Sequence, residues 1–124
     1  MDRNRILLVE DEPGIGTSLL QILKMHGLEA VLCDSGKDAL TALEKDVFNL
    51  VLCDVNLPDF SGYEILKQVR ENHNTSKIPF IFLTAYADEA DVRKGMNLGA
   101  DDYITKPFSA KSLVEAIHTK LAVR

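Results

Sequence analysis

The sequence has no long apolar run. A membrane-spanning helix needs roughly 18 consecutive apolar residues, and no window of this chain approaches that length. The first apolar run, residues 6–9, is too short for a signal-peptide core and is followed at once by Glu10, Asp11 and Glu12. We therefore expect a protein that stays in the cytoplasm and has no membrane partner.

Positive charge is also scarce. The 14 Lys and Arg residues are outnumbered by 19 Asp and Glu residues, which gives a net charge of −5. A nucleic-acid-binding domain normally carries a basic surplus or stripe, because contacts with phosphate supply much of its affinity. The longest basic run here is Arg93-Lys94, so we expect no direct binding of nucleic acid by this chain.

Cysteine is too rare for a disulfide scaffold. The two cysteines, Cys33 and Cys53, each end an apolar run, and the sequence contains no CxxC pair. Small buried hydrophobic side chains are the common role of such cysteines. A metal cluster built on thiolates is therefore not expected.

The chain itself has the composition of one globular domain, with 124 residues of which 46% are hydrophobic and 27% charged. Continuous apolar runs at 6–9, 50–53 and 80–83 are typical of strands buried on both faces of a parallel sheet. The weaker runs at 28–32 and 103–104 are typical of edge strands, where one side meets water.

Helical patterns fill the intervals between these runs. Serine followed three residues later by an acid predicts helix starts at Ser35, with Asp38, and at Ser61, with Glu64. The segment 87–98 is helical by composition, but its apolar residues form no clean stripe. The chain thus alternates strand and helix five times.

This alternation predicts a flavodoxin-like α/β fold, a doubly wound parallel sheet of five strands with five helices. Interior first, third and fourth strands select the order 2-1-3-4-5. Right-handed crossovers then place helices one and five on one face and the other three on the opposite face. The strands of Cys33 and Cys53 lie two spacings, about 9.6 Å, apart, whereas a disulfide needs Cα atoms within about 7 Å. We expect free thiols.

Acidic residues follow two neighbouring strands of the predicted sheet. Glu10, Asp11 and Glu12 follow the first strand, and Asp54 ends the third. Ligands bind at the carboxyl ends of such strands, near the point where the strand order reverses. Carboxylates this close repel one another unless a cation lies among them. Oxygen-only ligands predict Mg²⁺.

A hydroxyl and an ammonium group are predicted at the same edge. Thr84 ends the fourth strand, and Lys106 follows the fifth. The set suits in-line phosphoryl transfer, in which the metal and Lys106 neutralise phosphoryl oxygens, Thr84 donates a hydrogen bond and Asp54 attacks.

The whole chain, residues 1–124, resembles the receiver domain of bacterial two-component response regulators. The resemblance rests on the acid pair Glu10-Asp11, the run 52–62 around Asp54, the run 83–85, the run 99–103, and Lys106-Pro107-Phe108. It implies a phosphorylation-dependent signalling receiver that is not an enzyme beyond its own phosphorylation and autodephosphorylation. The expected phosphoryl donor is a histidine kinase or a histidine phosphotransfer domain.

The resemblance also implies residue roles. Asp54 accepts the phosphoryl group, and Thr84 and Lys106 bind it. Mg²⁺ is held directly by Asp11 and Asp54, through water by Glu10, and by the backbone carbonyl of Asn56. A cis peptide bond between Lys106 and Pro107 is implied as well.

Similar receivers switch through the threonine and an aromatic residue on the fifth strand. The resemblance predicts that phosphorylation draws Thr84 toward Asp54 and lets Tyr103 turn inward. The face of helix four, strand five and helix five would then change shape, to be recognised by partners or by a second copy in a homodimer. Asn56 and Tyr86 are expected to flank the path of the hydrolytic water, where Tyr86 would shield the acyl phosphate.

Two other classes share parts of this pattern. Phosphatases of the haloacid dehalogenase type use an aspartyl nucleophile with a second aspartate two residues later, whereas Asn56 takes that place here and cannot transfer a proton. A flavodoxin-like cofactor carrier needs a neutral loop after the first strand, and Glu10, Asp11 and Glu12 would repel a flavin phosphate.

Overall fold

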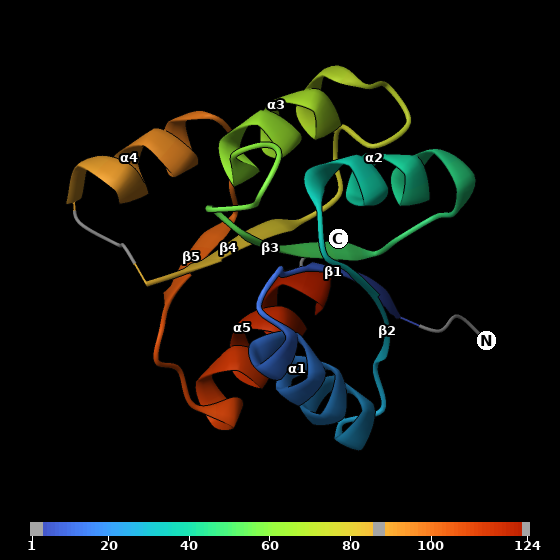
Figure 1. Ribbon diagram of the computed structural model, residues 1–124, viewed down its shortest axis with the longest axis vertical. Coiled ribbons are helices and arrows are strands. Elements are labelled where there is room, and N and C mark those ends of the chain that lie inside the picture. The colour runs from blue at the N-terminus through green and yellow to red at the C-terminus, as the bar shows by residue number, and fades with distance from the viewer. Residues whose placement is uncertain (1–3, 86–88, 123–124) are drawn as a thin grey trace.

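The computed structural model describes residues 4–85 and 89–122, which form a three-layer α/β structure (Figure 1). Strands and helices alternate along the chain: β1 (Arg5–Val9), α1 (Pro13–Met25), β2 (Glu29–Cys33), α2 (Gly36–Lys45), β3 (Leu50–Asp54), α3 (Gly62–Glu71), β4 (Phe80–Thr84), α4 (Glu89–Asn97), β5 (Asp102–Thr105) and α5 (Ala110–Ala122). The predicted segment 87–98 thus contains α4, and its residues 87 and 88 lie outside the described residues.

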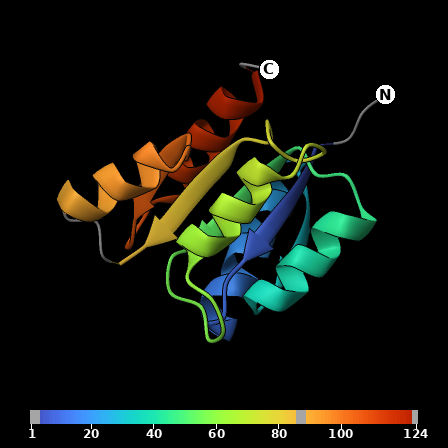
Figure 2. The ribbon, with the colours of Figure 1, turned by 90° about the horizontal axis from the view of Figure 1, so that it is seen from above.

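The sheet is parallel throughout and has the order β2-β1-β3-β4-β5. Helices α1 and α5 cover one face, and α2, α3 and α4 cover the other (Figure 1). The strands run side by side in one direction, so their carboxyl ends share one edge (Figure 2). Fold class, strand order and helix placement are therefore confirmed.

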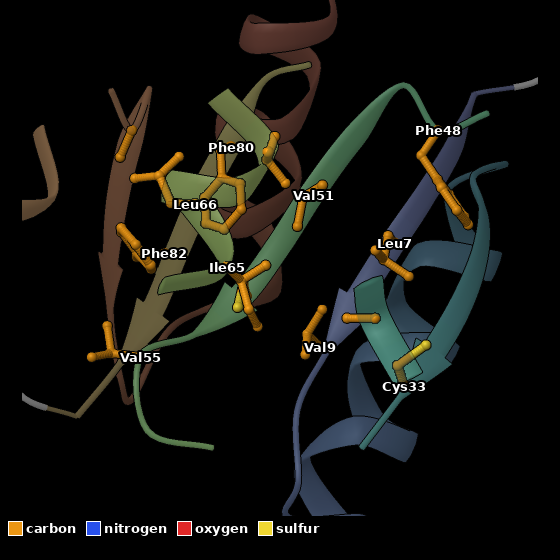
Figure 3. Packing of buried hydrophobic residues seen from close by; sticks show 14 residues of the cluster. Leu7, Val9, Cys33, Phe48, Val51, Val55, Ile65, Leu66, Phe80 and Phe82 are labelled. Carbon is orange, nitrogen blue, oxygen red and sulfur yellow. The ribbon is translucent and has the colours of Figure 1, made fainter. Parts of the chain in front are cut away.

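Burial explains why these segments form strands in these places. Every residue of β3 and β4 is buried, whereas β2 and β5 are mostly half-buried, as edge strands are. Two apolar clusters fill the layers on either side of the sheet. In one of them, Ile65 and Leu66 of α3 lie against Val51 and Phe80 of the sheet (Figure 3).

Local signals set the helix ends as predicted. The Ser35 and Ser61 hydroxyls accept hydrogen bonds from the backbone N–H groups of Asp38, at 3.1 Å, and Glu64, at 3.4 Å. Both cysteines are buried and free. Burial raises the pKa of the Cys53 thiol well above its ordinary value, so this side chain is an inert part of the core.

None of the described helices is long and apolar enough to cross a membrane.

Candidate functional site

The carboxyl edge of the sheet gathers the polar residues that the sequence places at strand ends. Glu10 follows β1, Asp54 ends β3 and Thr84 ends β4, and all three are almost fully buried, with exposed fractions of 2%, 5% and 0%. Buried polar groups at the ends of adjacent strands are costly unless they have partners or a role. This edge is therefore the strongest candidate for a functional site among the described residues.

Lys106 lies among the acids of this edge. Its Nζ atom is 2.8 Å from Asp54 Oδ2, 2.8 Å from Glu10 Oε1 and 3.9 Å from Glu12 Oε1. The peptide bond to Pro107 is cis, as predicted. The backbone N–H of Lys106 donates to the Thr84 carbonyl at 2.7 Å. This hydrogen bond joins the main chain of Lys106 to the end of β4.

The site contains more negative charge than Lys106 offsets. Burial, together with the charge of Asp54, raises the pKa of Glu10, although Lys106 acts in the opposite direction. Burial by itself would lower the pKa of Lys106, but its hydrogen bond with Asp54 and its charge interactions with Asp54 and Glu10 outweigh this effect and raise it. Glu10 Oε1 is buried, and no described residue directs a hydrogen-bond donor at it, although the ammonium charge is close.

These carboxylates fit a hard divalent cation. One oxygen each from Glu10, Glu12 and Asp54 lie within 4.8 Å of one another. Carboxylate oxygens at such separations are the ligands that Mg²⁺ takes, with water completing its shell. The buried Glu10 oxygen that lacks a directed donor supports the same conclusion, because a cation would satisfy it.

The predicted metal ligands are only partly brought together. Glu10 and Asp54 belong to the group of close carboxylates, which also includes Glu12, whereas Asp11 is exposed and is not among them. The backbone N–H of Asn56 donates to Asp54 Oδ1 at 3.0 Å, which orients the aspartate. The roles of Asp11 and of the Asn56 carbonyl stay predictions, and Tyr86 lies outside the described residues.

Sequence reasoning missed Asp59, in the loop after β3. Its carboxylate accepts hydrogen bonds from the backbone N–H groups of Gly36, Lys37 and Phe60, at 2.8–2.9 Å. These donors lower the pKa of Asp59. The loop that carries Asn56 is thereby fixed to the first turn of α2. The turn dipeptide Pro58-Asp59 marks the loop, but not its distant partner.

The parallel α/β fold and the acid-and-lysine edge are together typical of a receiver domain of the response regulator kind. The family model of the response regulator receiver domain matches residues 6–118. The chain belongs to this family.

Relatives and solved structures agree with that assignment. The chain is 37% identical over 121 residues to the transcriptional regulatory protein CreB of Escherichia coli, covering 98% of this chain and 52% of that protein. It is 40% identical over 116 residues to the sensory transduction protein RegX3 of Mycolicibacterium smegmatis, covering 94% and 50%. The chain thus spans about half the length of the curated relatives it matches.

Among solved structures, a putative response regulator from Chloroflexus aurantiacus has a TM-score of 0.93 and 33% identity, with 98% of this chain and 99% of that chain covered. The receiver domain of the sensor histidine kinase PA1611 from Pseudomonas aeruginosa, with a magnesium ion coordinated in its active-site cleft, has a TM-score of 0.90 and 30% identity, with 98% and 99% covered.

Proposed function

We propose that this chain takes a phosphoryl group onto Asp54 from a phosphohistidine of a histidine kinase or histidine phosphotransfer domain. The observation that carries the proposal is the buried Asp54 carboxylate with Lys106 Nζ 2.8 Å away. An Asp54 oxygen attacks phosphorus, the phosphorus–nitrogen bond breaks, and the imidazole leaves with its electron pair and takes a proton. The chain acts on no other substrate, beyond the hydrolysis of its own acyl phosphate.

The side chains around Asp54 have separate parts in this step. The Asn56 N–H group holds Asp54 Oδ1, which leaves the carboxylate oriented for attack. Lys106 stabilises negative charge on the phosphoryl oxygens, and the Thr84 hydroxyl donates a hydrogen bond to one of them. In the transfer, Lys106 exchanges its contact with the aspartate for one with the phosphoryl group.

Mg²⁺ is the cofactor that this site fits. Asp54 and Asp11 would bind it directly, Glu10 through water, and Asn56 through its backbone carbonyl. Glu12 joins this set as a further candidate, because its carboxylate lies with those of Glu10 and Asp54. When bound, the ion supplies charge neutralisation between the aspartate and the phosphoryl oxygens.

The surface beside the site offers room for a phosphodonor. A hollow next to Lys106 is lined by Ile15 and Ser18 of α1 and by Pro107 and Phe108 of the β5–α5 loop. Apolar side chains around one cation suit a partner helix that presents a phosphohistidine. Docking there would bring the phosphorus atom to the carboxyl edge of the sheet.

The proposed output is the face of α4, β5 and α5, which changes shape when Thr84 and Tyr103 move and which a partner or a second copy of this chain recognises. Direct binding of nucleic acid is not part of the proposal, since the net charge of the 124 residues is −5. Several relatives are named as transcriptional or DNA-binding regulators, and they are about twice as long as this chain.

Intact-mass measurement after incubation with acetyl phosphate and Mg²⁺ tests the phosphoacceptor. The wild-type chain is expected to gain one phosphoryl group, about 80 Da. Asp54→Asn should show no gain. Asp46→Asn, which changes an exposed aspartate at the other end of the sheet, should label like the wild type. Full labelling of Asp54→Asn would overturn the assignment.

A further inference from the structure

Tyr63, the second residue of α3, lies between the predicted switch residue and α4. Its hydroxyl donates to the backbone carbonyl of Asp91 in α4 at 3.2 Å. The hydroxyl oxygens of Tyr63 and Tyr103 are 3.0 Å apart. A phenol has a single hydrogen to donate. Because the hydroxyl hydrogen of Tyr63 points to the Asp91 carbonyl, the Tyr103 hydroxyl is the donor to the Tyr63 oxygen. The two hydrogen bonds thus connect β5 through α3 to α4.

Ring contacts strengthen the same connection. The Phe82 ring lies 5.1 Å from the Tyr63 ring and 5.4 Å from the Tyr103 ring, centre to centre. The Lys94 ammonium of α4 lies 4.6 Å from the centre of the Tyr63 ring, a cation–π distance. A Cβ atom at Gly95 would be only 3.1 Å from Tyr103. Helix α4 therefore lies closely against Tyr103 and is joined to Tyr63 at two points.

Tyr63 is also close to the phosphoacceptor along the chain. The preceding Gly62 packs so tightly on β3 that a Cβ atom there would clash with the Asp54 carbonyl. The Gly62 N–H group donates to Val55 at 2.6 Å. The start of α3 is thus fixed against the backbone of Asp54, and Tyr63 is the next residue after that contact.

We propose that Tyr63 is a positioning residue of the switch, which couples the Tyr103 ring and the first turn of α4 so that they move as one unit. The inference rests on the proposed phosphorylation at Asp54 and deepens it. It adds a connection through α3 to the one through Thr84. Because both hydrogen bonds of this connection depend on the Tyr63 hydroxyl, the coupling is weakened in a variant that keeps only the aromatic ring.

Amide hydrogen exchange of the unmodified protein tests the connection. Tyr63→Phe keeps the packing on Phe82 and the contact with Lys94 but removes both hydrogen bonds. Exchange across residues 89–97 should become about two- to tenfold faster, as the loss of about one net hydrogen bond to α4 predicts. Unchanged exchange of residues 89–97 would overturn the proposal.

Thr75→Val is the matched control. It also removes a hydroxyl, which is buried and donates to the Val69 carbonyl at 2.8 Å, but Thr75 lies in the turn that follows α3, away from the switch. Its faster exchange should centre on the end of α3. If it accelerates residues 89–97 as much as Tyr63→Phe does, the effect of Tyr63→Phe is a general loss of stability and the proposal fails.

A second comparison adds beryllofluoride, a phosphate mimic, with Mg²⁺. In the wild type, exchange should change in 89–97 and 102–105 together. In Tyr63→Phe, the change in 102–105 should remain while that in 89–97 shrinks, and an equal response of 89–97 in both proteins contradicts the coupling. If the wild type responds only around Asp11 and Asp54, the proposed output face is wrong. The role of Tyr63 is then still tested by the exchange rates of the wild type and Tyr63→Phe without beryllofluoride.

Discussion

The carboxyl edge of the sheet and the opposite edge each hold a cation that joins several elements, but their surroundings differ. At the opposite edge, Arg70 of α3 donates to three backbone carbonyls and to Asp101, at 2.7–3.1 Å. At the carboxyl edge, Lys106 stands between Glu10 and Asp54, with Glu12 close by.

The opposite edge therefore stabilises the fold, whereas the carboxyl edge holds more negative charge than its one cation neutralises. The Arg70 guanidinium has neutral acceptors and one acid, so its charge is matched and hydrogen bonded. The acids around Lys106 exceed its single charge. Burial, together with the charge of Asp54, raises the pKa of Glu10. A cation is therefore expected to stabilise the carboxyl edge and to have no effect at the other.

The largest effect on stability is expected from Arg70→Met. The change keeps the aliphatic part of the side chain but removes bonds that hold the α3–β4 and α4–β5 connections together. We expect a loss of about 2–3 kcal/mol in the free energy of unfolding, measured by urea denaturation. Lys67→Met, an exposed change in the same helix, should be nearly neutral. A loss below about 0.5 kcal/mol for Arg70→Met would contradict the conclusion that Arg70 makes the opposite edge a stabilising part of the fold.

The next effect concerns the metal ligands. Asp11→Ala should weaken Mg²⁺ binding at least about tenfold, the size found when residues that only support a metal ligand are removed, and should leave the metal-free stability equal or higher because like charges repel less. Titration calorimetry measures the affinity. Glu12→Gln is the paired variant. If it weakens binding and Asp11→Ala does not, Glu12 is the ligand and the prediction for Asp11 is wrong.

The raised pKa of Glu10 predicts a pH dependence without metal. Above the ordinary glutamate pKa, 4.5, the unfolded chain releases its proton before the folded chain does. Stability from this group is therefore present below that pH and is lost as pH rises through the folded pKa. Over this window the free energy of unfolding of the wild type should fall relative to that of Glu10→Gln, which does not titrate at this position. The exposed control Glu115→Gln should show no such trend, and a trend of opposite sign would contradict the burial of a charged Glu10.

The smallest effect is expected at an exposed ion pair of the opposite edge. Arg5 lies 3.5 Å from Glu29 and 3.6 Å from Asp46, both with side chains about half exposed. Exposed pairs contribute about 0–1 kcal/mol, so Arg5→Met should lower the free energy of unfolding by less than about 1 kcal/mol. A loss as large as that of Arg70→Met would mean that hydrogen bonding to carbonyls is not what distinguishes Arg70.

The sequence predicts the carboxyl edge far better than the opposite one. Asp54, Thr84 and Lys106 follow apolar runs, and parallel strands bring their carboxyl ends to one edge whatever the loops do. No periodic pattern marks Arg70, because its acceptors are carbonyls of loops that only the folded chain brings near.

Side-chain directions within the site are likewise not set by strand order. Asp11 and Glu12 follow the same strand, and only the folded turn decides that Glu12 lies with Asp54. The Tyr63–Tyr103 contact joins residues 40 apart in the sequence and depends on how α3 lies over β4 and β5. Such contacts are tertiary, so local propensity and spacing carry no signal for them.

Thermal unfolding in increasing concentrations of Mg²⁺, at constant ionic strength, tests most directly whether the carboxylates of the carboxyl edge bind a divalent cation. Binding to the folded state alone raises the melting temperature with ligand concentration. We predict a rise for the wild type and an equal rise for Arg70→Met from its lower starting point, with little or none for Asp54→Asn. A wild type that does not respond, or an Asp54→Asn variant that responds as strongly, would contradict a metal site at Asp54.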